Sequence, residues 1–414
     1  YLVFDTDFCE NSLYSSIIKH SQYVVDSTHI YYCQYIYNSI NCSESYHLMN
    51  CRECDQSKYL SYCIMCSNCE YCVWCSNLVG KKYCINNIQY TKQEYEQLIA
   101  TTIPHYPDHL LQRTTYKVHD EGGVGNNLYS TKNCVLSYNI WFSEQLRYCD
   151  LVTDCHYSYD VSSFGGTTTW ALECVSVGLD CSHIYFSNVI TAGSSHIYYS
   201  TALIGCHHMF GCAFMKNKSY CIFNKQYTKE EYEKRVANII GCMQETGERG
   251  DFFHPSLSPF GYNETVAQEY FPLSREETLG RWYTWSDYSS DPKIPAWAIL
   301  LTWDQIPSDI VTVTDDIIKQ VIICEISKRP FMIQKAELEF YRKHNLPLPR
   351  KHPDVRYEER MKLRPGRTLY LRNCDKCTKE MLSVYAPKEV LLEGDTKYEW
   401  KVYCESCYQQ EIYA

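Results

Sequence analysis

The feature that most constrains the fold of this chain is a step of three residues. The stretch CIMCSNCEYCVWC, from Cys63 to Cys75, places a cysteine at every third position. The same step runs backwards to Ser12 through serine, cysteine, isoleucine, valine and leucine. A period of three matches neither the 3.6 residues of a helical turn nor the two of a strand. The pattern therefore excludes an ordinary amphipathic helix or strand in this region.

Taken at every sixth residue, the step separates into a small series and an apolar series. Such a short repeat is typical of a β-solenoid, in which coils stack and equivalent side chains form interior columns. Coils of about twelve residues suit this alternation, because a narrow core cannot hold two large residues opposite each other. The small series is Ser15, Ser21, Ser27, Cys33, Ser39, Ser45, Cys51, Ser57, Cys63, Cys69 and Cys75, and the apolar series begins with Ile18, Val24, Ile30 and Ile36.

The same pattern returns in the middle of the chain. It runs from Leu128 to Val161, loses its phase near the sequence GGTTTW, resumes at Cys181 and slips by one residue at Gly193. The two regions end in true repeats 137 residues apart, KKYCINNIQYTKQEYEQLI and KSYCIFNKQYTKEEYEKRV. Each repeat contains a capping box, Thr-x-x-Glu, which predicts a short helix that covers the end of a solenoid.

The duplication bears on the role of the cysteines. Cys72 corresponds to Met209 and Cys66 to Leu203, and metal ligands would not be exchanged for such residues, whereas core residues would. We interpret the cysteines as core residues of the solenoid. An iron–sulfur cluster, a zinc site within the run, and disulfides between residues six apart such as Cys63 and Cys69 stay open as alternatives. The predicted core cysteines are Cys51, Cys54, Cys63, Cys66, Cys69, Cys72, Cys75, Cys206 and Cys212.

A more specific metal motif lies near the end of the chain. Two Cys-x-x-Cys pairs, Cys374 with Cys377 and Cys404 with Cys407, can supply four thiolates to one structural Zn²⁺ ion in a zinc ribbon. The alternatives are four free thiols or disulfides. A zinc-thiolate site favours a reducing compartment such as the cytoplasm.

Lysine and arginine outnumber acidic residues in the segment that leads into this motif, between residues 328 and 372. A basic segment next to a zinc ribbon indicates a surface for nucleic acid or another anionic partner. A solvated basic face that balances an acidic solenoid explains the same composition. The candidate residues are Arg350, Lys351, Arg356, Arg360, Lys362, Arg364 and Arg367.

Composition sets further limits. The formal charge of −10 makes the whole molecule a poor nonspecific binder of polyanions. The 39 tyrosines, which outnumber all other aromatic residues together, fall largely between the inward positions and predict a tyrosine-rich outer face. No apolar run is long enough to span a membrane. No nucleophile–base pair, recognisable pair of acids or phosphate loop appears.

Several long phrases resemble one family across nearly the whole chain: KSYCIFNKQYTKEEYEK, KAELEFYRKHNLPLPRKHPDVRYEERMKLR and CDKC…YAP…YCESCY. They are similar to cysteine-rich proteins with a zinc ribbon, encoded mainly by uncultured bacteria with small genomes. The resemblance implies an N-terminal portion with further Cys-x-x-Cys pairs that this chain lacks. It also implies a second metal site, of which only Cys324 and His352 are present, because Ser327 and Val355 stand where the family has cysteines.

These observations predict a mainly β protein with a duplicated β-solenoid, capping helices and a C-terminal zinc ribbon. The expected order is a first solenoid block (1–89), a helical excursion (90–124), a second block (125–226), a capping helix with a packed linker (227–320), and a basic segment with the ribbon (321–414). We expect a non-enzymatic scaffold that docks protein partners or associates with itself. Binding of nucleic acid or ribonucleoprotein through residues 328–372 is the alternative, and a carbohydrate-active solenoid ranks last.

Overall fold

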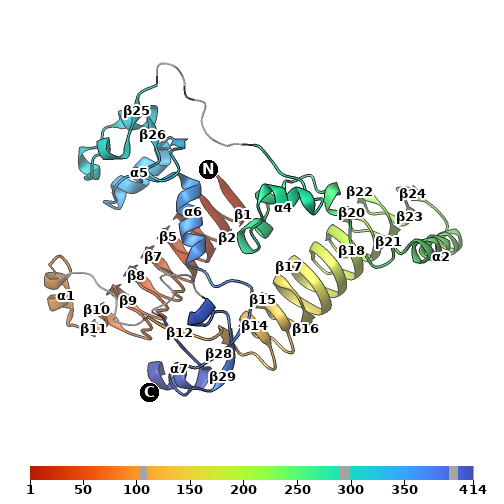
Figure 1. Ribbon diagram of the computed structural model, residues 1–414, viewed down its shortest axis with the longest axis horizontal. Helices are drawn as coiled ribbons and strands as arrows, with labels where there is room; N and C mark the ends of the chain where they lie inside the picture. The colour runs from red at the N-terminus through yellow and green to blue at the C-terminus, as the bar shows by residue number, and fades with distance from the viewer. Residues whose placement is uncertain (102–109, 289–293, 295–297, 391–399, 414) are drawn as a thin grey trace.

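The computed structural model describes residues 1–101, 110–288, 294, 298–390 and 400–413. Two β-solenoid blocks meet near the middle of the molecule and diverge from there, each ending in a helix, as Figure 1 shows. The predicted mainly β fold with stacked coils is confirmed. None of the helices in the described part of the chain is both long enough and apolar enough to span a membrane.

The first block stacks coils of twelve residues. Except in the antiparallel hairpin at its end, where Ile85 pairs with Ile88, strands pair in parallel with the residues twelve positions later, for example Val3 with Ser15 and Leu48 with Leu60. One sheet contains β1 (Val3–Asp7), β2 (Ser15–Lys19), β4 (Thr28–Tyr31) and β6 (Ile40–Ser43). The other contains β3 (Gln22–Val25), β5 (Gln34–Tyr37), β7 (Tyr46–Met49), β8 (Lys58–Ser61), β9 (Glu70–Val73), β10 (Lys82–Ile85) and β11 (Ile88–Gln89).

The second block begins at residue 117, before the expected boundary at 125, because β13 already pairs with β14. Its strands are β13 (Lys117–Val118), β14 (Val124–Tyr129), β15 (Val135–Trp141), β16 (Glu144–Arg147), β17 (Asp150–Gly178), β18 (Ser182–Thr191), β19 (Ser195–Tyr198), β20 (Thr201–Ile204), β21 (His207–Phe210), β22 (Ala213–Lys216), β23 (Ser219–Ile222) and β24 (Lys225–Gln226).

The sequence loses its step of three near GGTTTW and at Gly193 because some coils contain thirteen residues instead of twelve. Between β17 and β19 the parallel partners are thirteen residues apart, as in Thr169 with Ser182 and Ser182 with Ser195. The added residues stack on one another, since the amide of Asp180 donates to the carbonyl of Gly166 at 3.0 Å. Both residues have positive φ. Three coils therefore carry one extra residue at the same corner.

The backbone bends at every third residue. From Leu2 to Asn77, each third residue has a φ between 46° and 58°, and none of them is glycine. This left-handed conformation costs an L-residue about 1–2 kcal/mol. Stacking of these side chains between coils offsets the cost, as in the rings of Tyr62 and Trp74, whose centroids lie 4.4 Å apart. Four such bends per coil give it four short sides.

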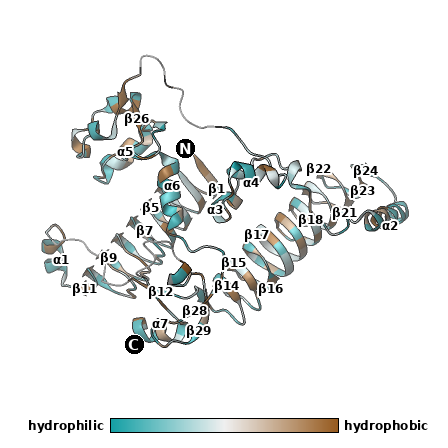
Figure 2. Cartoon of the chain, in the orientation of Figure 1, coloured by the Kyte–Doolittle hydropathy of each residue, from teal (hydrophilic) through white to brown (hydrophobic). Residues whose placement is uncertain are grey.

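The residue after each bend points inward and fills the core. Leu60, Cys63, Cys66, Cys69 and Cys72 are 0 % exposed. All nine predicted core cysteines are buried and free, and they belong to the apolar clusters of the two blocks. The predicted burial of these cysteines in the solenoid core is therefore confirmed. Figure 2 shows apolar and polar residues alternating along the strands of both blocks.

Inward serines and cysteines satisfy their polar groups with the backbone. The Ser27 hydroxyl donates to the Val25 carbonyl at 2.9 Å and accepts from the Ser39 amide at 3.0 Å. The Cys63 thiol donates to the carbonyls of Ser61 and Cys72 at 3.4 and 3.3 Å. The hydroxyl of Ser27 and the thiol of Cys63 thus play the same part in the small columns, and neither is left unpaired in the core.

This equivalence leads to a first prediction. Replacing Cys63 by serine should change the free energy of unfolding by less than about 1 kcal/mol, because the hydroxyl can make the same hydrogen bonds. Leu60→Ala in the apolar column of the same coil should cost about 2–5 kcal/mol through the cavity it leaves. Urea unfolding of both variants measures the difference. A Cys63→Ser variant as unstable as Leu60→Ala would contradict a packing role for the cysteines.

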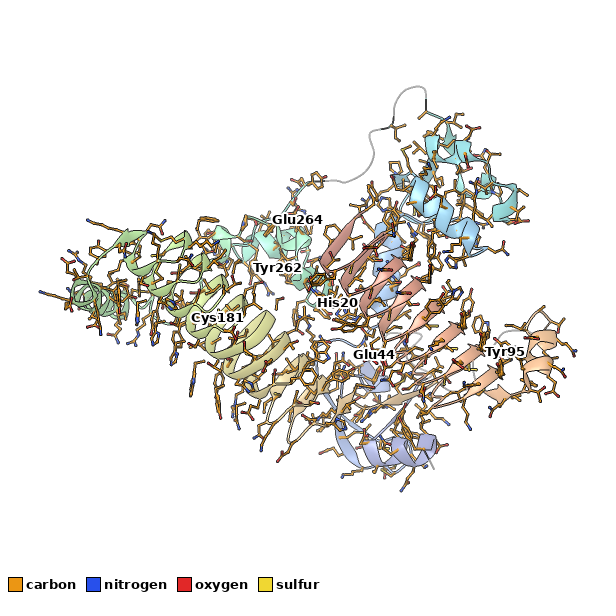
Figure 3. The ribbon with its side chains drawn as sticks, turned by 180° about the vertical axis from the view of Figure 1, so that it is seen from behind. His20, Glu44, Tyr95, Cys181, Tyr262 and Glu264 are labelled. Carbon is orange, nitrogen blue, oxygen red and sulfur yellow. The ribbon has the colours of Figure 1, made fainter. Side chains whose placement is uncertain are left out.

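Both predicted capping helices are present. In α1 (Lys92–Leu98) and α2 (Lys229–Thr246), Thr91 with Glu94 and Thr228 with Glu231 form complete capping boxes. Buried Tyr95 and Tyr232 pack against the last rings of the two solenoids, Tyr83 and Tyr220, at 5.7 and 5.8 Å. Figure 3 shows Tyr95 at the end of the first block and Cys181 within the second. Residues 102–109 of the expected excursion lie outside the described residues.

The rest of the chain returns from α2 to the place where the blocks meet. It contains α3 (Val266–Tyr270), α4 (Arg275–Gly280), β25 (Leu300–Leu301), β26 (Val321–Ile323), β27 (Pro330–Phe331), α5 (Lys335–Lys343) and α6 (Pro353–Lys362). A capping box, Ser274 with Glu277, opens α4. The last elements are β12 (Leu111–Arg113), which comes from between the blocks, with β28 (Tyr370–Asn373), β29 (Glu380–Ser383), β30 (Lys401–Tyr403) and α7 (Glu405–Tyr413).

Candidate metal centre

Four cysteine side chains converge near the C-terminus. The sulfur atoms of Cys374, Cys377, Cys404 and Cys407 all lie within 4.8 Å of one another. Three of the residues are buried and Cys377 is exposed. In the described part of the chain, this is the one group of three or more cysteine, histidine or acidic side chains close enough to hold a metal ion. The predicted ligand set therefore comes together in space.

The local backbone holds these sulfurs in place. β28 and β29 form a hairpin whose turn carries Cys374 and Cys377, and Cys404 lies between the end of β30 and the start of α7. Asp375 joins the two parts, because its amide donates to the Val402 carbonyl at 3.1 Å and its carboxylate accepts from the Val402 amide at 2.7 Å. The two cysteine pairs thus form one small ribbon.

Hydrogen bonds at Cys374 and Cys404 lower the pKa of these two ligands and favour their thiolate form. The amides of Cys404 and Lys376 donate to the Cys374 sulfur at 3.2 and 3.5 Å. Burial acts to raise the pKa of Cys404, but hydrogen bonds from the Ser406 hydroxyl and the Cys407 amide outweigh it and lower the pKa to about 6. Because thiolates rather than thiols bind metals, this environment fits a metal ion held by four sulfurs.

The ribbon is joined to both solenoid blocks. β30 pairs in parallel with β12, the strand that leads from the first block to the second. Arg113 of β12 makes an ion pair of 2.5 Å with Glu405, and the Tyr408 hydroxyl donates to Asn77 of the first block at 2.9 Å. A metal ion that orders the ribbon would therefore also support the place where the two blocks meet.

The partial second site, Cys324 with His352, has the backbone of the first ribbon without its ligands. The amide of Cys324 donates to the Arg329 carbonyl, as that of Cys374 does to Lys379. The Glu325 amide donates to the Arg350 carbonyl, as that of Asp375 does to Val402. By this correspondence Ser327 occupies the place of Cys377, and Val355 that of Cys407.

His352 has another task in this second ribbon. Its Nδ1 accepts a hydrogen bond of 3.1 Å from the Asp354 amide and thereby caps α6. Within the described residues, Cys324 and His352 have no third side chain beside them that could complete a metal site. Phe331, Ile333 and Val355 pack there in an apolar cluster with Cys324.

The shared backbone can be tested by restoring the missing sulfurs. The variant S327C/H352C/V355C should bind one further equivalent of Zn²⁺, since its four thiols would occupy the positions seen in the C-terminal ribbon. S327C alone should bind no more than the unmodified chain. Native mass spectrometry counts the metal ions directly. A triple variant that folds and keeps the original metal content would show that the two ribbons differ in geometry.

Three of the seven basic candidates between residues 328 and 372 lie inside the molecule. Arg356, Arg360 and Arg364 are buried, so the prediction that they belong to an exposed anion-binding surface is wrong. Their charge is used within the chain, because α6 packs against the acidic first block. Of the remaining candidates, Arg367 pairs with Asp150 at 2.6 Å and Lys351 with Glu359 at 2.7 Å, while Arg350 and Lys362 are exposed.

A buried network fixes α5 and α6 on the first block. Arg356 pairs with Asp26, and also with Glu337 at 3.5 Å. Glu337 accepts hydrogen bonds from the hydroxyls of Tyr14 at 3.0 Å and Tyr341 at 2.9 Å. Burial raises the pKa of the Glu337 carboxyl group, and the opposing effect of the Arg356 charge is smaller. These pairings join residues far apart in the sequence, and nothing in the local pattern around Asp26 announces them.

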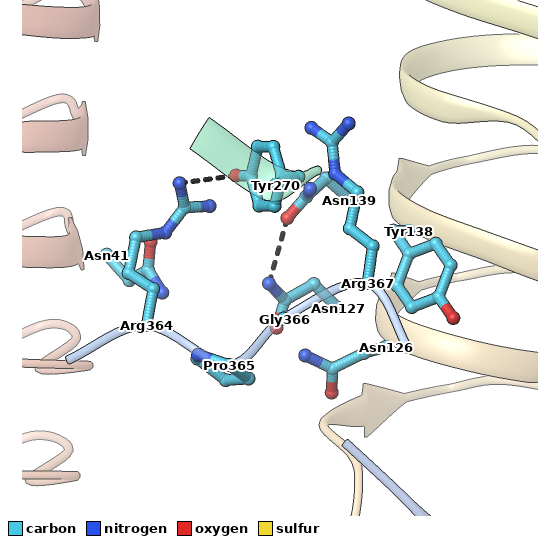
Figure 4. Close-up of a pocket in the computed structure, with 10 residues that line it drawn as sticks. All are labelled: Asn41, Asn126, Asn127, Tyr138, Asn139, Tyr270, Arg364, Pro365, Gly366 and Arg367. Atoms are coloured by element: carbon cyan, nitrogen blue, oxygen red, sulfur yellow. Dashed lines mark hydrogen bonds between the residues drawn. The ribbon is translucent and has the colours of Figure 1, made fainter. Parts of the chain in front are cut away.

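A pocket of about 270 Å³ lies where the two blocks meet. Its walls are amides and guanidinium groups, as Figure 4 shows, and Asn127 donates to Asn139 at 2.8 Å. Arg364 donates to the Tyr270 hydroxyl at 2.6 Å and to the Nε2 atom of the buried His29 at 3.0 Å. The full lining is Asn41, Asn126, Asn127, Tyr138, Asn139, Tyr270, Arg364, Pro365, Gly366 and Arg367.

His29 makes this junction sensitive to acid. Burial and the charges of Arg364 and Arg367 hold its pKa well below the usual 6.5. The folded protein thus binds fewer protons here than the unfolded chain, so the stability from this site is complete above pH 6.5 and falls as the pH drops below it. We expect a loss of up to about 1.4 kcal/mol per pH unit, absent in His29→Gln. Urea unfolding at pH 7.0, 6.0 and 5.0 compares the two proteins, and equal slopes would exclude His29.

Comparisons with known proteins give no family. No family model and no curated protein matches the chain. Among solved structures, a putative acetyltransferase from Desulfovibrio desulfuricans G20 is 8 % identical over 49 % of this chain and 53 % of its own, with a TM-score of 0.10. The polySia-specific acetyltransferase NeuO is 10 % identical over 57 % of this chain and 95 % of its own, with a TM-score of 0.08. This chain spans about half the length of the Desulfovibrio protein. TM-scores this low do not establish that the structures are alike.

Proposed function

We propose that this protein is a non-enzymatic scaffold whose solenoid faces dock protein elements and whose C-terminal ribbon holds one structural Zn²⁺ ion. One observation carries the proposal: the first block already binds a separate part of the chain on its outer aromatic rings. The ammonium group of Lys343 lies over the ring of Tyr35 at 4.4 Å, and His344 contacts His47 at 5.2 Å. The face that the stacked rings form is therefore suited to docking.

The character of the outer surface supports this use. Stacked rings along the coils are rigid and combine apolar area with polar tips, which is the composition of energetically important residues in protein interfaces. The rings exposed to solvent on the coils include the stacked Tyr62 and Trp170, and also Phe142, Tyr148 and Phe214. The pocket at the junction is lined by amides, guanidinium groups and tyrosines, a set without a nucleophile and its base.

The identity of the metal follows from ligand chemistry. Four thiolates in tetrahedral reach are the preferred ligands of structural zinc, and a site closed by four protein ligands leaves no position for a substrate. A zinc ion here would therefore contribute folding energy rather than catalysis.

Photo-crosslinking tests the docking function. p-Benzoylphenylalanine placed at Tyr62, Tyr148 or Phe214 of the full chain should give discrete covalent adducts in extract of the native host, or dimers in purified protein. The same group at Leu257, which is exposed in the segment after α2, is the matched control. Absence of adducts at all three solenoid positions, with a monomeric chain in sedimentation velocity, would refute the proposal.

A further inference from the structure

The internal duplication allows equivalent faces of the two blocks to be compared. β10 of the first block and β23 of the second lie in the two repeated sequences and therefore correspond to each other. Earlier strands of the two blocks are matched by counting coils backwards from these two strands. Five coils back, Gln22–Val25 of the first block correspond to residues 156–159 of the second. By this count Tyr23, Tyr35, His47, Asp26 and Asn38 correspond to Tyr157, Trp170, His183, Asp160 and Glu173.

In the first block this face is occupied. Asp26 is 1 % exposed because Arg356 and Arg360 of α6 lie on it. Lys343 covers the rings of Tyr23 and Tyr35, and Tyr37 contacts Phe340 at 6.0 Å. The occupant is thus a pair of amphipathic helices that bring cations to a carboxylate and to a row of rings.

In the second block the corresponding face is open. Tyr157 and Tyr159 are both 44 % exposed, Trp170 is 51 % exposed, and Asp160 is exposed as well. The rings form the same kind of row, since Tyr157 stacks on Trp170 at 5.1 Å and His183 on His196 at 4.7 Å. Large aromatic rings exposed side by side on a regular sheet indicate an interaction surface.

The open face also has negative charge without a cation. Glu173 takes the place of the neutral Asn38. The open face therefore carries two carboxylates, Asp160 and Glu173, where the first block has only Asp26. Asp251, from the segment after α2, adds a third negative charge. Burial, together with the charges of Asp160 and Asp251, raises the pKa of Glu173. In the described residues, no lysine or arginine forms an ion pair with any of these three acids.

We propose that the face formed by Tyr157, Trp170, His183, Asp160 and Glu173 docks an amphipathic helix of a partner protein that presents arginine or lysine. The inference rests on the scaffold function and names the surface and the chemistry of the partner. The chain's own α5 and α6 are not the occupant, because both are already held on the first block by the buried contacts of Asp26 and Glu337. Charge complementarity selects a basic partner, and the row of rings accommodates its aliphatic and aromatic residues.

A peptide of residues 333–364 from this chain is the probe, because it carries Lys343, Arg356 and Arg360 in their natural spacing. Labelled peptide is titrated with the full chain and followed by fluorescence anisotropy. We expect saturable binding that weakens at higher salt and at least tenfold in D160N/E173Q. The variant E230Q/E245Q, which removes two carboxylates from the exposed side of α2, should bind the peptide as the unmodified chain does.

The outcomes separate this inference from the scaffold function. Absence of saturable binding, or equal binding to D160N/E173Q and the unmodified chain, would overturn the inference. Self-association of the full chain that D160N/E173Q abolishes would assign the face to a second copy and also overturn it. In either case, adducts at Tyr62, Tyr148 or Phe214 would leave the scaffold function standing. Equal thermal stability of the variants excludes misfolding as the cause of a loss.

Discussion

We expect that replacing Cys404 and Cys407 by serine abolishes metal binding at the proposed zinc site and unfolds the C-terminal ribbon. The ribbon is too small to fold on its own apolar core, which consists of Val384, Tyr385, Trp400 and Val402. Binding of structural zinc contributes about 10–16 kcal/mol in small zinc domains, far more than such a core can replace. Native mass spectrometry should show the loss of one zinc ion. Hydrogen exchange should show loss of protection in β28, β29, β30 and α7.

The effect should extend to the junction of the blocks. Without the ribbon, β12 loses its partner strand, Arg113 loses Glu405, and Asn77 loses the Tyr408 hydroxyl. Protection of residues 111–113 should therefore fall, while the coils far from the junction stay protected. Cys242→Ser, which removes an exposed cysteine of α2, is the control and should change nothing. Full protection of the ribbon in the absence of metal would contradict a structural role.

Arg356→Met should destabilise the protein by about 3–5 kcal/mol. The change keeps most of the side-chain volume but leaves Glu337 buried without its cation and Asp26 with Arg360 alone, and the loss of one partner of a buried ion pair is costly. Urea unfolding followed by hydrogen exchange should report early release of α5 and α6 from the first block.

Two further variants test the cause. E337Q/R356M should recover most of the lost stability, because Glu337 is then neutral and Asp26 keeps Arg360, so that no buried carboxylate lacks a cation. Arg342→Ala breaks an exposed ion pair of 2.5 Å with Asp315 and should cost no more than about 1 kcal/mol. If Arg356→Met and Arg342→Ala had equal effects, the buried network would not be what holds the helices.

The solenoid and the ribbon could be predicted because each follows from a short local pattern. A step of three determines which residues face inward, and two Cys-x-x-Cys pairs identify four ligands. The left-handed bends were not foreseen, because φ is a property of the backbone and many residue types occupy these positions, among them Met65, Trp74 and Glu53. The frequent asparagine and tyrosine one residue before each inward position were the available signal.

The burial of Arg356, Arg360 and Arg364 could not be read from the sequence. A basic helix looks the same whether it faces solvent or an acidic surface, and only the packing of α6 on Asp26 decides between them. The open face of the second block was missed for the same reason. Its equivalence to the first block depends on counting coils of twelve and thirteen residues, which the phase slips near Gly166 and Gly193 obscure.

The regular coils also make the molecule extensible in fixed increments. Because equivalent residues repeat every twelve positions in the first block, insertion or deletion of twelve residues would leave every column and every bend in place. Each such step would move α1 relative to the junction by about 4.8 Å, the spacing between paired strands. The length of the first block can therefore change by whole coils while its core residues stay the same. The distance between α1 and the junction changes with it in equal steps.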